Sequence, residues 1–273
     1  MPANRPAVRP EPAKAEVRNL PARVIPFAAP DLTGNERKYL NECIDTGWVT
    51  HGGRFEPEFE AAFGRKFGRP AITASSGTAA LHLALLALGV GPGDEVLVPA
   101  LTFCATAAVV CAVGATPVFV DIDPRTLGMD RDGAARALTE RTRAVIPVHL
   151  YGEDAGEFGA LGPAVIEDAC EALGMVPQRG DYTAYSFYGN KVITSGEGGM
   201  LCGEHLAKAR LWRDGGFDRN YQNIVPGLNY RMCNLQAALG LAQIERFDAL
   251  LARRLANADA YRRALPGVGR WLF

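Results

Sequence analysis

Residues 71–100 read AITASSGTAALHLALLALGVGPGDEVLVPA. The apolar residues from Thr78 to Leu88 predict a helix, and the Gly-Pro-Gly turn that follows leads into a short strand over Glu95–Val98. The alternation continues along the chain, with helices predicted over 105–113 and 131–138 and strands over 117–122, 144–150, 164–166, 183–187 and 199–202. Helices that alternate with buried strands imply parallel crossover connections. The sequence therefore predicts an α/β fold in which a mainly parallel sheet of about seven strands lies between helices.

The two ends of the chain differ from this alternating middle. The first 25 residues carry prolines at 2, 6, 10, 12 and 21 without hydrophobic periodicity, which predicts a mobile Pro-rich arm. From Asn234 to Leu265 the apolar residues keep helical spacing, which predicts one long helix that can bend. We therefore expect an arm over 1–25, a large domain over 26–233, and a C-terminal part over 234–273 that begins with this helix.

Composition limits the classes of function. The chain has 273 residues, 48% of them hydrophobic, and a formal net charge of -1, so it can bury a full core but lacks the basic field that nucleic acid or an anionic membrane requires. The sequence shows neither a signal-peptide core nor a membrane-spanning run. Its six scattered cysteines are predicted to be reduced, buried thiols. We expect a cytoplasmic protein whose partners are small molecules and other protein chains.

A candidate anion site lies at the start of the first core helix. Ser75, Ser76, Gly77 and Thr78 directly precede the apolar helix, so backbone N–H groups, hydroxyls and the positive helix end converge on one point. Such a point suits a phosphate group. A serine N-cap without a ligand explains the same residues, because such caps are common.

A pair of carboxylates follows a buried strand. Val165 and Ile166 lead into Glu167 and Asp168, and the C-terminal ends of parallel strands face the crevice where ligands bind. Because side chains alternate along a strand, only one of the two carboxylates points into that crevice. An Asp at this place can hold a proton on a pyridine nitrogen. A solvated acidic loop or a helix cap is the alternative interpretation.

Lys191 stands out because lysine is scarce in this chain. Only five of the 29 basic residues are lysines, and Lys191 lies between an aromatic stretch and the glycine-rich stretch 196–199. A primary amine, unlike a guanidinium group, can lose its proton and form an imine. The position predicts a catalytic lysine, with an ordinary surface lysine as the alternative.

A phosphate cradle, a strand-end aspartate and a glycine-flanked lysine, in this order, are the parts of a fold-type I pyridoxal 5'-phosphate (PLP) enzyme. The sequence resembles, in order and spacing, the DegT-type family of nucleotide-sugar aminotransferases. The segments that carry the resemblance are SSGTAALHLALLALGVGPGDEVLVPALTF (75–103), PVFVDIDP (117–124), PVHLYG (147–152), VIEDACEALG (165–174), YSFYGNKVITSGEGGM (185–200) and GLNYRMCNLQAALGLAQIE (227–245). The resemblance runs from about residue 25 to about residue 265, nearly the whole chain. Glu171 and the motif GNK-x-IT-x-GEGG (189–199) resemble the perosamine-synthase-like branch of the family, which acts at the 4-position of the sugar.

The resemblance implies a role for individual residues. Lys191 would form the Schiff base with PLP, and Asp168 would pair with the pyridine nitrogen. Phe103 would stack on the ring, although the sequence alone makes it a core residue. The full set of cofactor-binding residues is Ser76, Gly77, Thr78, Phe103, Asp168, Glu171, Ser186, Asn190, Lys191 and Asn229, with Gly77, Thr78 and Ser186 at the phosphate and Glu171 beside the 3-hydroxyl.

The resemblance also implies an assembly and a reaction. Asn229 would reach the phosphate bound by a neighbouring subunit, which makes the active unit a homodimer with shared sites. The reaction would move an amino group, by resemblance from glutamate, to a keto group of a nucleotide-linked deoxysugar. No metal is expected, because His51, His82, His149 and His205 show no ligand spacing.

Two other functions stay open. Phe273 lies where the family continues into a small C-terminal domain, so the resemblance implies that this domain is largely missing. A truncated, non-catalytic dimer of the PLP fold is therefore one alternative. A PLP-dependent sugar dehydratase is the other, although such enzymes carry histidine where this chain has Lys191.

Overall fold

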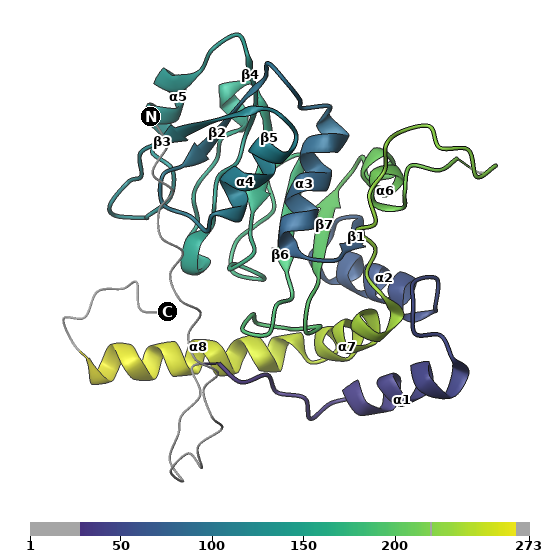
Figure 1. Ribbon diagram of the computed structural model, residues 1–273. Coiled ribbons are helices and arrows are strands. Elements are labelled where there is room, and N and C mark those ends of the chain that lie inside the picture. The colour runs from purple at the N-terminus through teal and green to yellow at the C-terminus, as the bar shows by residue number, and fades with distance from the viewer. Residues whose placement is uncertain (1–27, 219, 266–273) are drawn as a thin grey trace, which may run out of the picture.

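The computed structural model describes residues 28–218 and 220–265, and its centre is a seven-stranded sheet (Figure 1). The strands are β1 (Ala71–Ala74), β2 (Glu95–Pro99), β3 (Thr116–Val120), β4 (Thr142–Val145), β5 (Ala164–Asp168), β6 (Tyr182–Ser186) and β7 (Gly199–Gly203). They lie in the order β1-β7-β6-β5-β4-β2-β3, and within this sheet β7 alone runs in the opposite direction to the other strands. The predicted α/β fold with a mainly parallel sheet is confirmed.

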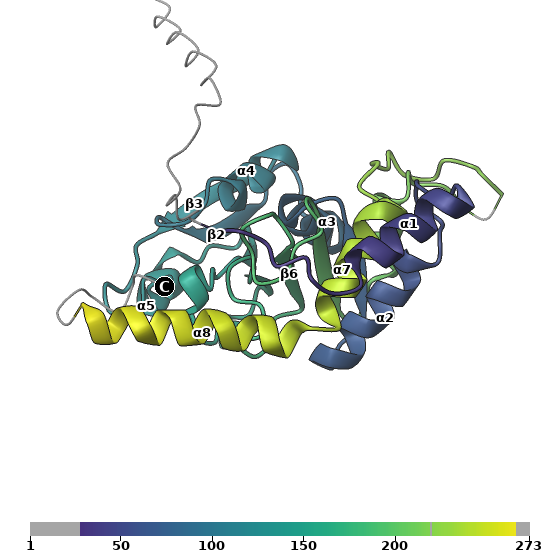
Figure 2. The same ribbon diagram turned by 90° about the horizontal axis from the view of Figure 1, so that it is seen from below.

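Helices cover both faces of the sheet (Figures 1 and 2). One face carries α3 (Gly77–Leu88), α4 (Ala105–Ala112) and α6 (Ala207–Arg213); the other carries α2 (Phe55–Phe67), α5 (Arg131–Ala137) and α7 (Asn234–Ile244). Successive side chains of a strand point to opposite faces of the sheet. Val96 and Val98 therefore pack with α3 and α4, whereas Leu97 packs with α5. Strands buried on both faces are typical of parallel sheets.

The remaining elements lie around these layers. α1 (Glu36–Thr46) packs on α7, and α8 (Phe247–Ala264) runs below the edge of the sheet at which β6 ends (Figure 1). Two short 3-10 turns, η1 (Leu150–Gly152) and η2 (Gly159–Leu161), connect β4 to β5. No helix within 28–218 or 220–265 is long and apolar enough to cross a membrane.

The helix α3 shows how local sequence sets the start of an element that matters for the site. The Ser76 hydroxyl accepts a hydrogen bond from the Ala79 amide at 3.0 Å, which caps the first turn. At the other end, Gly89 takes a left-handed conformation (φ 74°) and closes the last turn. The apolar residues between them are almost all buried, so the start of α3 is held firmly against the sheet.

Several expectations are corrected by the structure. The helix predicted over 234–265 is two helices, because the chain turns at Glu245 and Arg246. The strand predicted over 144–150 ends as β4 at Val145, since Pro147 has no N–H to donate. β1 was not among the predicted strands. It has four residues, too few to show alternation.

The cysteines are also only partly as expected. All six are free thiols, but Cys104 and Cys111 are exposed, so the prediction of buried thiols is wrong for these two. Cys104 is the N-cap residue of α4 and Cys111 lies in its last turn. The predicted arm, residues 1–25, lies outside the described residues.

Candidate active site

Four strands of the sheet end at one common edge. Since β7 is antiparallel to both β1 and β6, these two strands run in the same direction as β2, β4 and β5. Gly77, Phe103, Asp168 and Lys191 follow or close the C-terminal ends of β1, β2, β5 and β6 respectively. The predicted cofactor-binding residues therefore share the edge at which ligands bind in parallel sheets.

The start of α3 forms a cradle of backbone amides, defined here as Ser75 to Thr78. Ser76 satisfies two amides of the first turn, Ala79 through its hydroxyl and Ala80 through its carbonyl. The amides of Gly77 and Thr78 are then the first-turn donors left to point at a ligand. Ser76 is thus an N-cap, as the alternative interpretation holds. The amides of Gly77 and Thr78 nevertheless remain available to bind a phosphate.

Gly77 is required by close packing. A Cβ atom at this position would lie 2.6 Å from Cys170 Sγ and 2.9 Å from Ser186 Cβ. Only glycine lets the start of α3 approach the ends of β5 and β6 so closely. The structure therefore brings Gly77 and Ser186 together, so both can contact the same phosphate group.

Asp168 ends β5 with its side chain almost fully buried, 6% exposed. Its Oδ2 accepts a hydrogen bond from the hydroxyl of Thr106 on α4 at 2.9 Å, and its Oδ1 accepts one from the Cys170 amide at 3.2 Å. Thr106 is itself buried and lies 2.9 Å, hydroxyl to hydroxyl, from Thr102. These contacts fix the orientation of the carboxylate, which a partner of a ring nitrogen needs.

Glu167 belongs to a different environment. Its carboxylate accepts hydrogen bonds from the Thr183 hydroxyl at 2.7 Å and from the Arg179 amide at 3.0 Å. His149 Nε2 lies 3.6 Å from Glu167 Oε1, beyond hydrogen-bond distance. Glu167 is therefore committed to structural contacts, and Asp168 is the carboxylate of the pair that shares surroundings with Cys170 and Gly77.

Lys191 lies in the loop after β6, and its side chain is 20% exposed. Its Nζ is 3.5 Å from Glu171 Oε1, and Glu171 Oε2 accepts a hydrogen bond from the Tyr151 amide at 3.2 Å. Tyr151 has a left-handed backbone (φ 55°), an uncommon conformation for a residue with a side chain. The guanidinium of Arg254 on α8 donates to the carbonyl of Lys191. Loop, strand end and helix together hold the amine at this edge.

Cys170 follows Asp168 by two residues, and its amide donates to the Asp168 carboxylate. Burial raises the pKa of its thiol well above the ordinary value, the Asp168 carboxylate raises it further, and the Lys191 ammonium group opposes them. The Cys170 thiol is thus within electrostatic range of both Asp168 and Lys191. Cys170 itself stays a neutral thiol there and fills space beside Gly77.

The other predicted residues are placed at the surface of this edge. Phe103 is 71% exposed, so it is not a core residue and its ring is accessible to a ligand. Thr78, Asn190 and Asn229 are exposed too. Among the described residues, no group of three His, Cys, Asp or Glu side chains could hold a metal ion.

Sequence reasoning missed three residues of the site: Thr106, Tyr151 and Arg254. Thr102 and Thr106 are four residues apart at the start of a helix, a spacing that could have suggested a paired hydroxyl system. Nothing in the sequence marks the left-handed backbone of Tyr151 or the contact of Arg254, because both depend on elements far away in the chain.

Comparison with known proteins decides the family. Residues 30–271 match the model of the DegT/DnrJ/EryC1/StrS aminotransferase family. The chain belongs to this family. It is 48% identical to the GDP-perosamine synthase of Caulobacter vibrioides, over 90% of this chain and 71% of that protein. The GDP-perosamine synthase of Vibrio cholerae is 40% identical over 90% of this chain and 72% of its own length.

The solved structures agree with the sequence relatives. Spr1654 from Streptococcus pneumoniae, in its PLP-form, superposes with a TM-score of 0.80 at 32% identity and covers 89% of this chain and 72% of that one. The predicted family, aminotransferase activity and PLP cofactor of this chain are thereby confirmed. The roles of individual residues and the homodimer stay predictions.

The geometry fits the cofactor. A phosphate would meet the amides of Gly77 and Thr78, a pyridine nitrogen would meet the oriented carboxylate of Asp168, and Lys191 offers the primary amine beside both. Lysine at 191 also favours an aminotransferase over the dehydratase alternative.

Proposed function

We propose that this chain transfers an amino group from glutamate to the 4-keto group of a GDP-linked deoxysugar. The observation that carries the proposal is the placement of Lys191 beside Glu171, at the same sheet edge as Asp168, in a chain 48% identical to a GDP-perosamine synthase. PLP, when bound, supplies the carbonyl carbon that carries the amino group and a ring that takes up electrons. Side chains and backbone amides of the chain bind and orient the cofactor and move the proton.

Each residue of the site has a task in this proposal. Gly77 and Thr78 bind the phosphate through their amides, and Ser186 lies against Gly77 to complete that cradle. Asp168, oriented by Thr106, holds a proton on the ring nitrogen. Lys191 Nζ would hold the cofactor covalently and, as a free amine, would act as the base and acid that moves the proton during amino transfer. Glu171 keeps that amine in place from 3.5 Å.

The active unit of this proposal is a homodimer with shared sites. Asn229 supports it, because the residue is exposed and is therefore available to a second chain. Residues 227–232 also make contacts within their own chain. The Tyr230 carbonyl accepts a hydrogen bond from the Ser75 amide at 2.8 Å, and the Tyr230 hydroxyl lies 3.1 Å from His82 Nδ1. The segment thus braces the cradle of its own chain as well.

Domain boundaries and compartment belong to the same proposal. In this proposal the cofactor-binding domain spans 26–233, and 234–273 lead from it into a second part, with the first helix, α7, still packed on α1 and α2. The enzyme works in the cytoplasm, a reducing compartment that suits six free thiols.

An assay of the purified 273-residue chain tests the proposed reaction. With PLP, glutamate and a GDP-linked 4-keto-6-deoxysugar, we expect formation of 2-oxoglutarate and of an amino sugar, both absent in a Lys191→Ala control. A chain that binds PLP through Lys191 but releases no 2-oxoglutarate would instead be the non-catalytic dimer. Equal rates with wild type and Lys191→Ala would refute the role of the lysine.

A further inference from the structure

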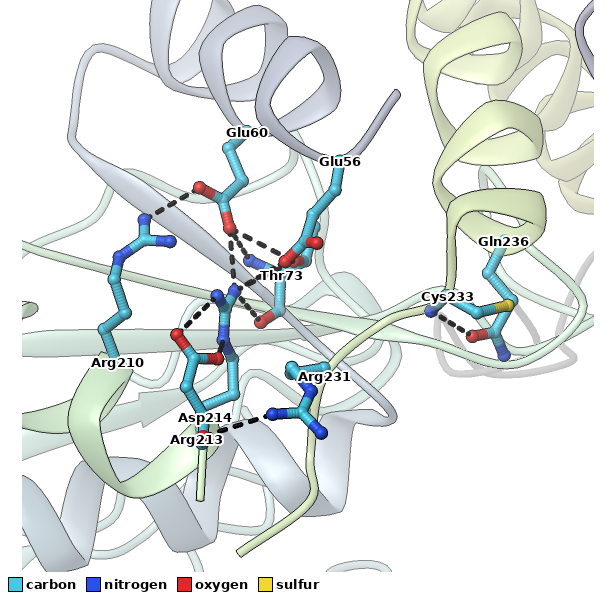
Figure 3. Close-up of polar contacts among 9 residues, drawn as sticks. All are labelled: Glu56, Glu60, Thr73, Arg210, Arg213, Asp214, Arg231, Cys233 and Gln236. Carbon is cyan, nitrogen blue, oxygen red and sulfur yellow. Dashed lines mark hydrogen bonds and ion pairs between the residues drawn. The ribbon is translucent and has the colours of Figure 1, made fainter. Parts of the chain in front are cut away.

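The strand that leads into the phosphate cradle has no strand on its outer side. β1 is the edge strand of the sheet and pairs only with β7 within it. Edge strands leave backbone groups without partners, and such groups need another source of hydrogen bonds. At Thr73, the residue two before Ser75, side chains provide them. The Thr73 amide donates to Glu60 Oε1 at 2.9 Å, and the Thr73 carbonyl accepts from Arg213 Nη1 at 3.0 Å (Figure 3).

Arg213 is the centre of this arrangement. It is the last residue of α6, its side chain is 3% exposed, and Figure 3 shows its guanidinium among the carboxylates of Glu56, Glu60 and Asp214. The closest N–O distances are 3.1 Å to Glu56, 2.9 Å to Glu60 and 2.7 Å to Asp214. A buried guanidinium is costly unless it is paired and fully hydrogen-bonded. A complete set of partners around one arginine therefore indicates a tightly specified position.

The backbone of the same residue holds the segment that carries Asn229. The Arg213 carbonyl accepts a hydrogen bond from the Tyr230 amide at 3.2 Å, and Asp214 forms an antiparallel bridge with Asn229. Tyr230 in turn accepts from the Ser75 amide at 2.8 Å. The contacts close a ring that runs from Arg213 through Thr73 and Ser75 to Tyr230 and back to Arg213.

This ring fixes two functional elements relative to each other. One is the cradle of the chain's own site, which begins at Ser75. The other is Asn229, which is exposed and which the proposed dimer assigns to the partner's site. We infer that Arg213 is a positioning residue that sets the phosphate cradle of its own subunit and the Asn229 contact to the neighbouring subunit at the same time. The inference rests on the proposed function, because it needs PLP in the cradle and a shared site.

Arg213→Lys tests the first half of the inference, that Arg213 sets the phosphate cradle of its own subunit. Arg210→Lys is the matched control. Arg210 lies on the same helix and pairs with the same Glu60 carboxylate at 2.8 Å, but its side chain is 45% exposed. A lysine at 213 keeps the charge but cannot reach Thr73, Asp214 and both glutamates at once, since an ammonium group lacks the planar fork. Thermal unfolding of each variant shows whether the fold is kept.

The readout is the equilibrium binding of PLP and of pyridoxal, which lacks the phosphate. We expect Arg213→Lys to weaken PLP binding about tenfold and to leave pyridoxal binding unchanged, because only the phosphate contact depends on the cradle. Arg210→Lys should match wild type for both ligands. Unchanged PLP binding in Arg213→Lys, or an equal loss for both ligands, would overturn the inference. If wild type binds PLP no better than pyridoxal, the proposed phosphate site fails instead.

A second variant covers the case in which Arg213→Lys does not fold. Asp214→Asn keeps the shape of the side chain and the backbone bridge to Asn229 but removes the negative charge that pairs with the Arg213 guanidinium. We expect the same selective loss of PLP binding, smaller than for Arg213→Lys. A folded Asp214→Asn protein with wild-type binding of both ligands would count against the inference.

Mixed dimers test the second half of the inference, that Arg213 also sets the Asn229 contact to the neighbouring subunit. When one subunit carries Lys191→Ala, the single working site takes its cradle from the other subunit and Asn229 from the Lys191→Ala subunit. Adding Arg213→Lys to the Lys191→Ala subunit therefore changes only the Asn229 contact. We expect weaker PLP binding at the working site. Wild-type binding there would refute the coupling across subunits, and a chain that stays monomeric would refute the shared site of the proposed function together with this half.

Discussion

Glu167 and Asp168 are consecutive residues of one strand, and their surroundings differ in kind. Glu167 accepts hydrogen bonds from Thr183 and from the Arg179 amide, within the structural framework around β6. Asp168 accepts its side-chain hydrogen bond from Thr106 and lies next to the cradle and the lysine loop. The alternation of a strand thus separates a carboxylate that holds the fold from one that can serve a cofactor. Substitutions at the two positions should therefore affect different measurements.

Asp168→Asn should show the largest effect on turnover. The amide keeps the size of the side chain but cannot hold a proton on a ring nitrogen as a carboxylate does. We expect a loss of about a hundredfold or more in kcat for amino transfer, with little change in thermal unfolding. Steady-state kinetics and calorimetry on the same preparation would check both. A variant with near wild-type kcat would contradict the role of Asp168.

Glu167→Gln should show the opposite profile. An amide replaces one acceptor oxygen by a donor, so at least one buried amide or hydroxyl loses its partner. We expect the free energy of unfolding to fall by about 1–3 kcal/mol, while kcat per folded molecule stays near wild type. Urea unfolding and active-site titration measure these two quantities. A large loss of kcat in a stable protein would mean that the two carboxylates are not separated in function.

Thr106→Val sharpens the comparison on the Asp168 side. Valine is close to threonine in shape but removes the hydroxyl that donates to Asp168 Oδ2 at 2.9 Å. We expect turnover to fall about tenfold, the equivalent of one hydrogen bond to a charged group. Thr102→Val, which removes only the outer hydroxyl of the pair, is the matched control and should cost less. Equal losses in both variants would argue for a packing effect instead.

The pH dependence of stability should show the smallest effect. Burial raises the pKa of Glu167, but the neighbouring His149, the Thr183 hydroxyl and the Gly180 and Arg179 amides lower it by more, so it lies below its ordinary value. A depressed pKa contributes stability above the unfolded value of about 4.3, and this contribution is lost as the pH falls through the folded pKa. The stability difference between wild type and Glu167→Gln should therefore shrink below about pH 4.3. A difference that grows on acidification would contradict this.

The comparison also shows what a sequence can reveal. The cradle, the strand-end carboxylates and Lys191 were predictable because each depends on neighbours in the chain: a cap before an apolar helix, a strand before acids, glycines around an amine. Thr106 is 62 residues away from Asp168, and Arg213 is 140 residues away from Thr73. Pairs at such separations leave no periodic signal, so only the packed fold shows them. The exposure of Phe103 was hidden for the same reason, since an apolar residue after a strand normally lies in the core.

The account depends most on Lys191, and reduction with borohydride tests it directly. Purified protein incubated with PLP should show the visible absorbance of a protonated imine, and borohydride should fix the cofactor to the peptide that contains Asn190, Lys191 and Val192. Lys191→Arg should lose both signals and keep its fold, because a guanidinium offers no free amine at neutral pH. Labelling of another lysine, or no labelling while PLP is demonstrably bound, would contradict the assignment of Lys191.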